Sequence, residues 1–269
     1  RIRAGGGLNW HELVSRLVAA GVGGLENLAL IPGTVGAAPV QNIGAYGLEI
    51  GERVIAVSGF DRHTGEPFCL SREDCQFSYR HSWFKQPQGQ SAIITQLELV
   101  LPRPWQPRLD YAPLAAAMLG QPSTPATIYA AVCAIRQQKL PDWRQLGNAG
   151  SFFKNPLLSA GEVEALYLRY PRLVAFAQPD DQVKLAAGWL IDQCGLKGFA
   201  IGGAAVHSEQ ALVLVNRSGQ ASSRELLQLA VAVRERVAAT FGVLLEPEVR
   251  FLGQYGELSF ADALACNGL

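Results

Sequence analysis

The stretch Gly147-Asn-Ala-Gly-Ser-Phe-Phe-Lys-Asn-Pro156 has the features of a ligand-binding turn, and the rest of the chain can be read outward from it. Gly147 and Gly150 permit backbone angles that other residues resist, and Pro156 ends the segment. Two phenylalanines are expected to anchor the turn. Between the glycines and the proline stand a hydroxyl, a cation and an amide, on Ser151, Lys154 and Asn155.

Ser151 could also be the nucleophile of a hydrolase, paired with His207. The nucleophile elbow needs glycine two residues before and two residues after the serine, and here Ala149 and Phe153 hold these positions. The spacing therefore argues against a serine hydrolase. A structural glycine turn with a capping serine is the other interpretation of an isolated segment of this kind.

The composition is that of a globular protein with a sizeable core. The chain has 269 residues, of which 49% are hydrophobic, and its formal net charge is zero. This length suits two modest domains or one large one. Without net charge there is no electrostatic case for a nucleic-acid or anionic-membrane partner. No apolar run reaches the roughly 20 residues that span a bilayer.

The cysteines and histidines predict neither a disulfide framework nor a metal site. The five cysteines form no Cys-x-x-Cys pair. An odd, scattered set fits a reducing compartment, which predicts a cytoplasmic protein. The four histidines are isolated in the sequence, so we expect no metal.

A second informative stretch is Ile31-Pro-Gly-Thr-Val-Gly-Ala-Ala-Pro-Val-Gln-Asn-Ile-Gly-Ala-Tyr-Gly47, which is rich in glycine and alanine and carries no charge. Small residues let backbone N–H and C=O groups approach a flat or phosphorylated ligand closely. The stretch is neither a dinucleotide fingerprint nor a P-loop. Close packing of backbone against backbone explains it equally well.

Hydrophobic periodicity predicts short strands in the first half and alternating helices and strands in the second. Asn9 should cap a helix that ends at Gly21. Strands are expected at residues 54–57, 67–70, 92–100, 211–216 and 243–245, with a turn at Thr64-Gly65. Further helices are expected at residues 128–138, after Ser159, over 183–194 and after Ser222. We place a domain boundary near Pro141.

Charged residues mark two further places. Tyr79 and Arg80 are predicted on an extended segment, where neighbouring side chains point to opposite faces and Arg80 can reach a carboxylate. Glu246 and Glu248 flank a proline at an apolar strand end, where a glutamate rarely lies without a partner. One of them is a candidate acid, base or charge partner of a site. The alternative in both places is a solvated surface.

Taken together, these segments closely resemble the UDP-N-acetylenolpyruvoylglucosamine reductase family, the flavoenzymes of peptidoglycan precursor synthesis. The resemblance extends over essentially the whole chain, and the Tyr111 region is similar to the longer, first type of the enzyme. The matching segments are residues 31–47, Tyr79-Arg80, 139–142, 147–156, 184–192, 202–207 and 246–250.

The resemblance implies an α+β fold. It implies part of an FAD-binding domain of the PCMH/VAO type over residues 1–141, a smaller α/β substrate-binding domain over 142–242, and a return strand with a tail over 243–269. FAD is the implied cofactor and NADPH the co-substrate. The implied reaction reduces UDP-N-acetylglucosamine enolpyruvate to UDP-N-acetylmuramate. We expect a cytoplasmic monomer without a nucleic-acid or membrane partner.

In family terms Ser151 is the proton donor, and Arg80 and Glu248 stabilise the intermediate that accepts the proton. The chemistry agrees, because hydride addition builds an enediolate-like carbanion that is basic enough to take a proton from a hydroxyl. The positions that hold the UDP-sugar match Tyr111, Lys139, Asn155 and Gln210. The flavin-contacting positions match Pro32, Gly33, Thr34, Gly36, Ala37, Ala38, Val40, Asn42, Ile43, Gly44 and Ala45.

One part of the family pattern has no counterpart. The family has an earlier strand–helix unit with a Gly-x-Gly-Ser-Asn loop that cradles the FAD pyrophosphate, and this sequence contains no such motif. We therefore expect an N-terminally truncated chain that binds FAD weakly or not at all and is inactive. Its tail residues Leu258, Phe260 and Leu264 should lack their cover. A non-catalytic UDP-sugar-binding homologue and a serine hydrolase are the alternative functions.

Overall fold

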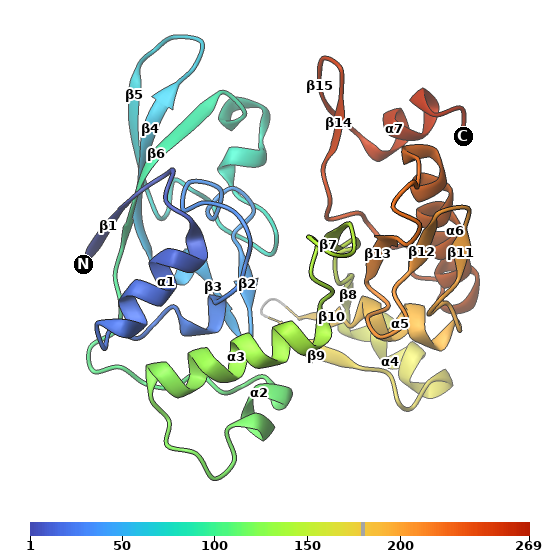
Figure 1. The fold of residues 1–269 in the computed structure, drawn as a ribbon, viewed down its shortest axis with the longest axis horizontal. Coiled ribbons are helices and arrows are strands. Elements are labelled where there is room, and N and C mark those ends of the chain that lie inside the picture. The colour runs from blue at the N-terminus through green and yellow to red at the C-terminus, as the bar shows by residue number, and fades with distance from the viewer. Residues whose placement is uncertain (179–180) are drawn as a thin grey trace. The chain divides into compact units, whose positions relative to one another are not determined.

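The computed structural model describes residues 1–178 and 181–269 and separates the chain into two compact units, Arg1–Gln138 and Lys139–Leu269 (Figure 1). All strand pairs among the described residues are antiparallel. Helices lie between the strands and after the last of them along the chain. The expected α+β class is confirmed.

The first unit is built on a four-stranded sheet with the strand order β1-β6-β4-β5. In β4 and β6, Val57 lies opposite Leu97, and both side chains are fully buried. The strands expected at residues 54–57, 67–70 and 92–100 are confirmed. The strands of this unit are β1 (Ile2–Gly5), β2 (Gly44–Ala45), β3 (Leu48–Glu49), β4 (Val54–Asp61), β5 (Pro67–Ser71) and β6 (Ala92–Leu99).

Three helices complete the first unit: α1 (Trp10–Ala19), α2 (Ala112–Ala117) and α3 (Pro125–Lys139). The Asn9 side chain accepts a hydrogen bond from the backbone of Glu12 at 3.0 Å, as predicted for an N-cap. Trp10 packs in the same core as Leu97. Short 3-10 turns are η1 (Glu26–Leu28), η2 (Ile50–Glu52), η3 (Trp83–Lys85) and η4 (Pro87–Gly89).

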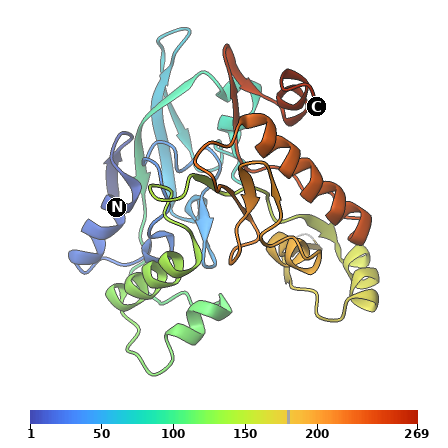
Figure 2. The ribbon, with the colours of Figure 1, turned by 45° about the vertical axis from the view of Figure 1, so that its right-hand side comes forward.

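The described part of the second unit holds a four-stranded sheet, a three-stranded sheet, a two-stranded hairpin and a long helix. The first sheet has the order β11-β12-β13-β7 and the second the order β8-β10-β9. Helix α6 (Ser223–Phe241) runs alongside β11, β12 and β13 (Figure 2) and buries Leu229 and Val233 completely. The remaining elements are β7 (Asn148–Ser151), β8 (Leu157–Ser159), α4 (Ala160–Arg169), β9 (Ala175–Ala177), β10 (Gln182–Leu185), α5 (Ala187–Gln193), β11 (Ala200–Ile201), β12 (Ala204–Val206) and β13 (Val213–Asn216).

Two predicted helix starts are confirmed. Ser159 and Ser222 each form a capping box with the glutamate three residues later, so the serine hydroxyl and the carboxylate satisfy each other's backbone N–H groups. Gly242, with φ of +71°, caps the end of α6.

Two predicted elements are wrong. Val183 lies in strand β10, where it pairs with Leu158 and Ala177, and the helix begins only at Ala187. The apolar residues at 183–187 fit both a helical and a strand period, and pairing on both sides selects the strand. No strand forms at residues 243–245, and the Leu245 carbonyl accepts a hydrogen bond from the side chain of Arg234 at 3.0 Å.

The C-terminal tail has its cover within the second unit. It forms the hairpin β14 (Phe251–Gly253) and β15 (Gly256–Leu258), followed by helix α7 (Phe260–Cys266). Phe260 packs with its ring centroid 5.4 Å from that of Phe251, under the guanidinium of Arg234, and α7 contacts α6. The expectation that Phe260 is uncovered is therefore wrong, and Leu258 and Leu264 are half-buried as well.

Candidate active site

Strand β7 presents Ser151 at a bulge. Gly150 adopts φ of +76°, and its N–H donates to Asn148 Oδ1 at 2.9 Å, while the pairing with β13 shifts register between Val213 and Val215. Such a bulge redirects the side chain that follows it. Ser151 is half-buried opposite Val213, and within the described part of the chain its hydroxyl has no hydrogen-bond partner.

The two phenylalanines after Ser151 anchor the turn, as predicted. Phe152 and Phe153 are 2% and 1% exposed and pack edge to face at 5.0 Å. The backbone on either side of Phe153 pairs with the Glu246–Glu248 segment. The Glu248 N–H donates to Phe152 O at 2.8 Å, and the Lys154 N–H donates to Glu246 O at 2.8 Å. The backbone of Glu248 therefore pairs with Phe152, the residue that follows Ser151.

The carboxylate of Glu246 has an identified partner. Its Oε2 lies 3.3 Å from Lys154 Nζ, in an ion pair whose glutamate side is largely exposed. This pairing accounts for Glu246 as a surface residue of the turn.

Asn155 and Gln210 both lie beside the first turn of α5. The Asn155 Oδ1 accepts the backbone N–H of Ala187 at 2.9 Å. A Cβ added to Gly188 would lie 3.6 Å from Gln210 Oε1, an ordinary contact distance, so the Gln210 amide lies beside the same turn. Two of the predicted substrate-binding side chains are therefore placed near the same helix turn.

The side chain of His207 binds the backbone at Glu209 and Gln210. Its Nδ1 accepts the N–H groups of Glu209 and Gln210 at 3.3 and 3.2 Å. Within the described residues no hydrogen bond joins His207 to Ser151. The geometry therefore lacks the nucleophile–base pair that a serine hydrolase requires.

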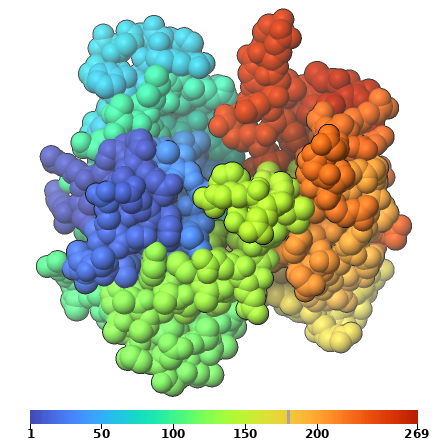
Figure 3. Space-filling model, in the orientation of Figure 1, coloured from blue at the N-terminus to red at the C-terminus, as the bar shows by residue number. Residues whose placement is uncertain are grey.

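Lys139 ends helix α3 with its side chain exposed. A cation is favourable at a helix C-terminus, which explains a lysine there without any ligand. The next residue, Leu140, packs against Val213 and Val215, so Lys139 adjoins the sheet that carries Ser151. Residues 142–145 are exposed, and the segment around them lies at the surface in Figure 3.

In the first unit, the glycine-rich loop is held by its backbone. The Gly36 N–H donates to Gly6 O at 2.8 Å, and a Cβ on Gly36 would lie 3.0 Å from Ile94 O. Close backbone packing therefore explains Gly36. At Gly33, with φ of +113°, the nearest atom to an added Cβ is 3.9 Å away, so the loop leaves open space there.

The predicted flavin-contacting residues divide by exposure. Exposed members are Pro32, Gly33, Thr34 and Ala37; half-buried members are Gly36, Val40, Gly44 and Ala45; buried members are Ala38, Asn42 and Ile43. Asn42 is an organiser of the loop. Its amide donates to Glu49 Oε2 at 2.7 Å and to Ser78 O at 3.0 Å, and its Oδ1 accepts from Gly51 N at 2.9 Å.

Arg80 lies in a tight turn, so the predicted extended segment is wrong. The backbones of Ser78 and His81 exchange two hydrogen bonds of 3.1 Å, which leaves Tyr79 and Arg80 at the tip. Arg80 adopts φ of +54°, an uncommon conformation for a residue with a side chain. Its Nη2 donates to Gly44 O at 3.1 Å. Strain of this kind is often retained at functional sites.

Tyr111 belongs to the first unit, where it precedes α2. Its ring packs edge to face on Tyr46 at 5.2 Å, and burial raises its pKa. The hydroxyl therefore stays protonated at neutral pH, as a hydrogen-bond donor to a phosphate must be.

The residues near the glycine-rich loop fit a flavin cofactor. Arg136, in α3, donates through Nη2 to Leu30 O at 3.3 Å, and its buried Nε has no partner among the described residues. A buried donor without an acceptor calls for a bound group. The open space at Gly33 and this donor both suit the acceptor atoms of FAD. No motif marks Arg136 in the sequence, because it is an interior residue of the helix Pro125–Lys139.

Family comparisons identify both units. A family model described as FAD binding domain matches residues 1–66, and one described as UDP-N-acetylenolpyruvoylglucosamine reductase, C-terminal domain, matches residues 141–252. A flavin-binding unit followed by such a domain defines a flavin-dependent oxidoreductase.

Similar proteins narrow this class. Proteins named UDP-N-acetylenolpyruvoylglucosamine reductase from Bordetella pertussis and Paraburkholderia xenovorans are both 53% identical to this chain, covering 92% of it and 71% and 72% of their own lengths. The crystal structure of the Thermus caldophilus reductase matches with a TM-score of 0.62 and 28% identity, over 92% of this chain and 71% of that one. The chain belongs to the UDP-N-acetylenolpyruvoylglucosamine reductase family.

These matches confirm the resemblance and FAD as the cofactor. They give no support to the expectation of an inactive chain, to a non-catalytic binder or to a hydrolase. Among residues 1–178 and 181–269 there is no helix long and apolar enough to cross a membrane, and no group of three or more metal-ligating side chains.

His11 gives the first unit a predicted acid sensitivity. Its Nδ1 accepts the N–H of Leu30 at 3.1 Å, and burial, together with the charge of Arg136, lowers its pKa below 6.5. The unfolded chain then binds more protons just below pH 6.5, so stability should fall as the pH drops from 6.5 through the folded-state pKa. In urea unfolding at stepped pH, His11→Asn should flatten this slope. An unaltered slope in His11→Asn would contradict the assignment.

Proposed function

We propose that Ser151 donates the proton, and that Arg80 and Glu248 stabilise the intermediate, in the reduction of UDP-N-acetylglucosamine enolpyruvate to UDP-N-acetylmuramate. The chain is an oxidoreductase of peptidoglycan precursor synthesis by family membership. FAD, when bound, supplies the hydride chemistry with NADPH as the reductant. The observation that carries the role of Ser151 is its hydroxyl, placed by a bulge and without a partner among the described residues.

The substrate must accept a proton after hydride addition, because the addition leaves an electron pair on carbon. Hydride addition to the terminal vinyl carbon leaves an electron pair on the neighbouring carbon, delocalised into the substrate carboxylate. The Ser151 O–H bond breaks, its proton forms the new C–H bond, and solvent restores the hydroxyl. A guanidinium such as Arg80 offsets the charge on the carboxylate, a kind of stabilisation worth roughly 3–4 kcal/mol elsewhere. Glu248 would assist through a hydrogen bond to the same intermediate.

We infer that the remaining predicted residues bind the two ligands. Tyr111 and Lys139 would contact the diphosphate of the UDP-sugar. Asn155 and Gln210 would hold the sugar end through their amides, a role that is supported by their position beside the same turn of α5. The loop from Pro32 to Ala45 would contact the flavin. The proposed domains are residues 1–141, 142–242 and 243–269.

We also propose that the protein works as a monomer in the cytoplasm. The five cysteines are all free, which suits a reducing compartment.

Substitution of Lys139 tests the substrate assignment. Lys139→Met should raise the KM for the UDP-sugar about tenfold, because one charge-assisted contact to a phosphate is lost. The rate of flavin reduction by NADPH should stay the same. The matched control is Arg144→Met, an exposed cation five residues away that pairs with Asp142 at 3.6 Å. Equal KM values for Lys139→Met and Arg144→Met would remove Lys139 from the site.

A further inference from the structure

Tyr46 and Tyr111 form one packed pair in the first unit. Their ring centroids are 5.2 Å apart with perpendicular planes, and burial raises the pKa of both hydroxyls. The two residues lie far apart in the sequence and on different kinds of segment. The contacts that hold the two backbone segments in place therefore determine the position of the Tyr111 hydroxyl.

The backbone at Tyr46 is strained. Tyr46 and Gly47 have φ of +50° and +81° and form the two-residue turn between β2 and β3. This left-handed turn favours Asn and Gly, so a tyrosine at its first position needs support from outside. The support is visible: the Tyr46 carbonyl accepts from Asn27 Nδ2 at 2.8 Å, and the Gly47 carbonyl accepts from Arg108 Nη1 at 2.7 Å.

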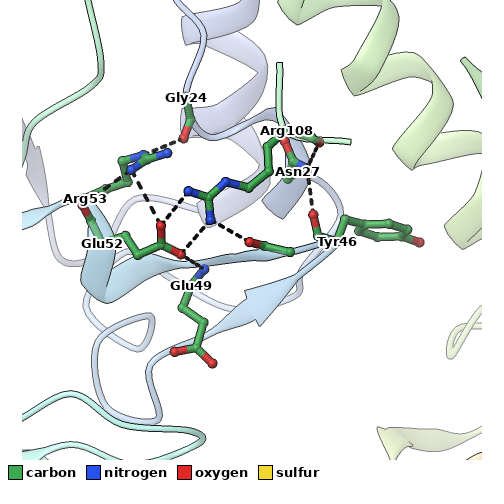
Figure 4. A network of polar contacts seen from close by, with 8 residues as sticks. Gly24, Asn27, Tyr46, Glu49, Glu52, Arg53 and Arg108 are labelled. Carbon is green, nitrogen blue, oxygen red and sulfur yellow. Dashed lines mark hydrogen bonds and ion pairs between the residues drawn. The ribbon is translucent and has the colours of Figure 1, made fainter. Parts of the chain in front are cut away.

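Asn27 joins the two tyrosine-bearing segments through one amide. The side chain is 1% exposed, and the same Nδ2 that reaches the Tyr46 carbonyl donates to the carbonyl of Arg108 at 2.9 Å (Figure 4). Arg108 stands three residues before Tyr111, on a stretch without regular secondary structure. A primary amide has two N–H donors, so it can serve both carbonyls at once.

The guanidinium of Arg108 makes further contacts to the same region. Besides the Gly47 carbonyl, it contacts both carboxylate oxygens of Glu52, with Nη2–Oε2 at 2.9 Å and Nη1–Oε1 at 3.1 Å. Figure 4 shows Arg108 between Glu52 and the Tyr46 turn. A planar guanidinium fixes direction as well as distance, which an ammonium does not. The turn that carries Tyr46 and the stretch that leads to Tyr111 are thus tied together twice.

We propose that Arg108 and Asn27 are positioning residues for the Tyr46–Tyr111 pair, and through it for the contact of Tyr111 with the UDP-sugar. The inference rests on the proposed role of Tyr111. Neither Arg108 nor Asn27 needs to touch the substrate. Their contribution is to hold a strained turn and an irregular stretch in one geometry before the substrate arrives.

A double-mutant cycle of Arg108→Gln and Tyr111→Phe tests the proposal, read as the KM for the UDP-sugar and, separately, as the rate of flavin reduction by NADPH. Each single substitution should raise the KM about tenfold, and the double mutant should do little more, because both remove the same contact. Flavin reduction should be unchanged. Arg108→Lys, which keeps the charge without the planar fork, should recover only part of the loss.

Arg53→Gln is the matched control. Arg53 belongs to the same network, with its Nε bonded to Gly24 O at 3.2 Å and its Nη1 4.0 Å from Glu52, yet no contact in Figure 4 joins it to the turn or to the stretch before Tyr111. It should lower the melting temperature and leave the KM alone. A KM unchanged by Tyr111→Phe would overturn the proposed role of Tyr111 and this inference with it. A normal KM in Arg108→Gln, or additive effects in the double mutant, would overturn the inference alone.

Discussion

Replacing Ser151 by alanine should separate the two half-reactions of the enzyme. The rate of flavin reduction by NADPH should stay at the wild-type value, since no proton from Ser151 is needed for it. Reoxidation of the reduced flavin by the UDP-sugar should fall by about a thousandfold or more, because general acid catalysis is worth about 10²–10⁴ in rate. Anaerobic stopped-flow absorbance in the flavin band measures both rates on the same sample.

The structure allows a clean control for this experiment. The Ser151 hydroxyl has no partner among the described residues, so its removal should change the melting temperature little. Ser223→Ala removes an exposed hydroxyl from the same unit and should preserve both rates. If the UDP-sugar reoxidises the reduced flavin of Ser151→Ala as fast as that of the wild type, another group donates the proton.

Replacing Arg80 by alanine should slow reoxidation by the substrate about 10²–10³-fold, the usual loss when one preorganised donor to a developing anion is removed. Flavin reduction by NADPH should again be retained. Arg80→Lys should recover little of the loss, because an ammonium cannot make the bidentate contact of a guanidinium with a carboxylate. Arg72→Ala, an exposed arginine in the same unit, is the control.

The backbone at Arg80 adds a second measurement. Because Arg80 has φ of +54°, Arg80→Gly should melt at a higher temperature than Arg80→Ala, as only glycine adopts this angle without cost. In both variants the UDP-sugar should reoxidise the reduced flavin at the same low rate. Greater activity in one of them would mean that the turn conformation, and not the guanidinium, carries the effect.

Local signals in the sequence predicted much of the fold. Asn9, Ser159 and Ser222 begin helices as expected, because capping depends on residues only three positions apart. The helix predicted from residue 183 is wrong over β10, because the apolar spacing there fits a helix as well as a strand. Its partners, β8 and β9, come from elsewhere in the chain and decided the outcome.

In the candidate site, too, neighbouring residues allow a prediction and pairing with distant segments does not. Residues 147–156 were recognisable because glycines, polar groups and phenylalanines stand together there. The bulge at Gly150 depends on pairing with β13, and the turn at Arg80 depends on the pairing of Ser78 with His81. The Asn27–Arg108 contacts join residues 81 positions apart and leave no pattern in the sequence. Side chains that act through distant carbonyls cannot be predicted from spacing.

The hydrogen bond from Ala187 to Asn155 Oδ1 bears on how the enzyme could escape an inhibitor. Any substitution that removes this oxygen leaves a backbone N–H without its acceptor, at a cost of about 1–3 kcal/mol if the group stays buried. Resistance to a compound that competes for Asn155 would then arise in a weakened protein. For antibacterial design, an atom that the fold itself requires is a more durable target than the exposed charge of Lys139.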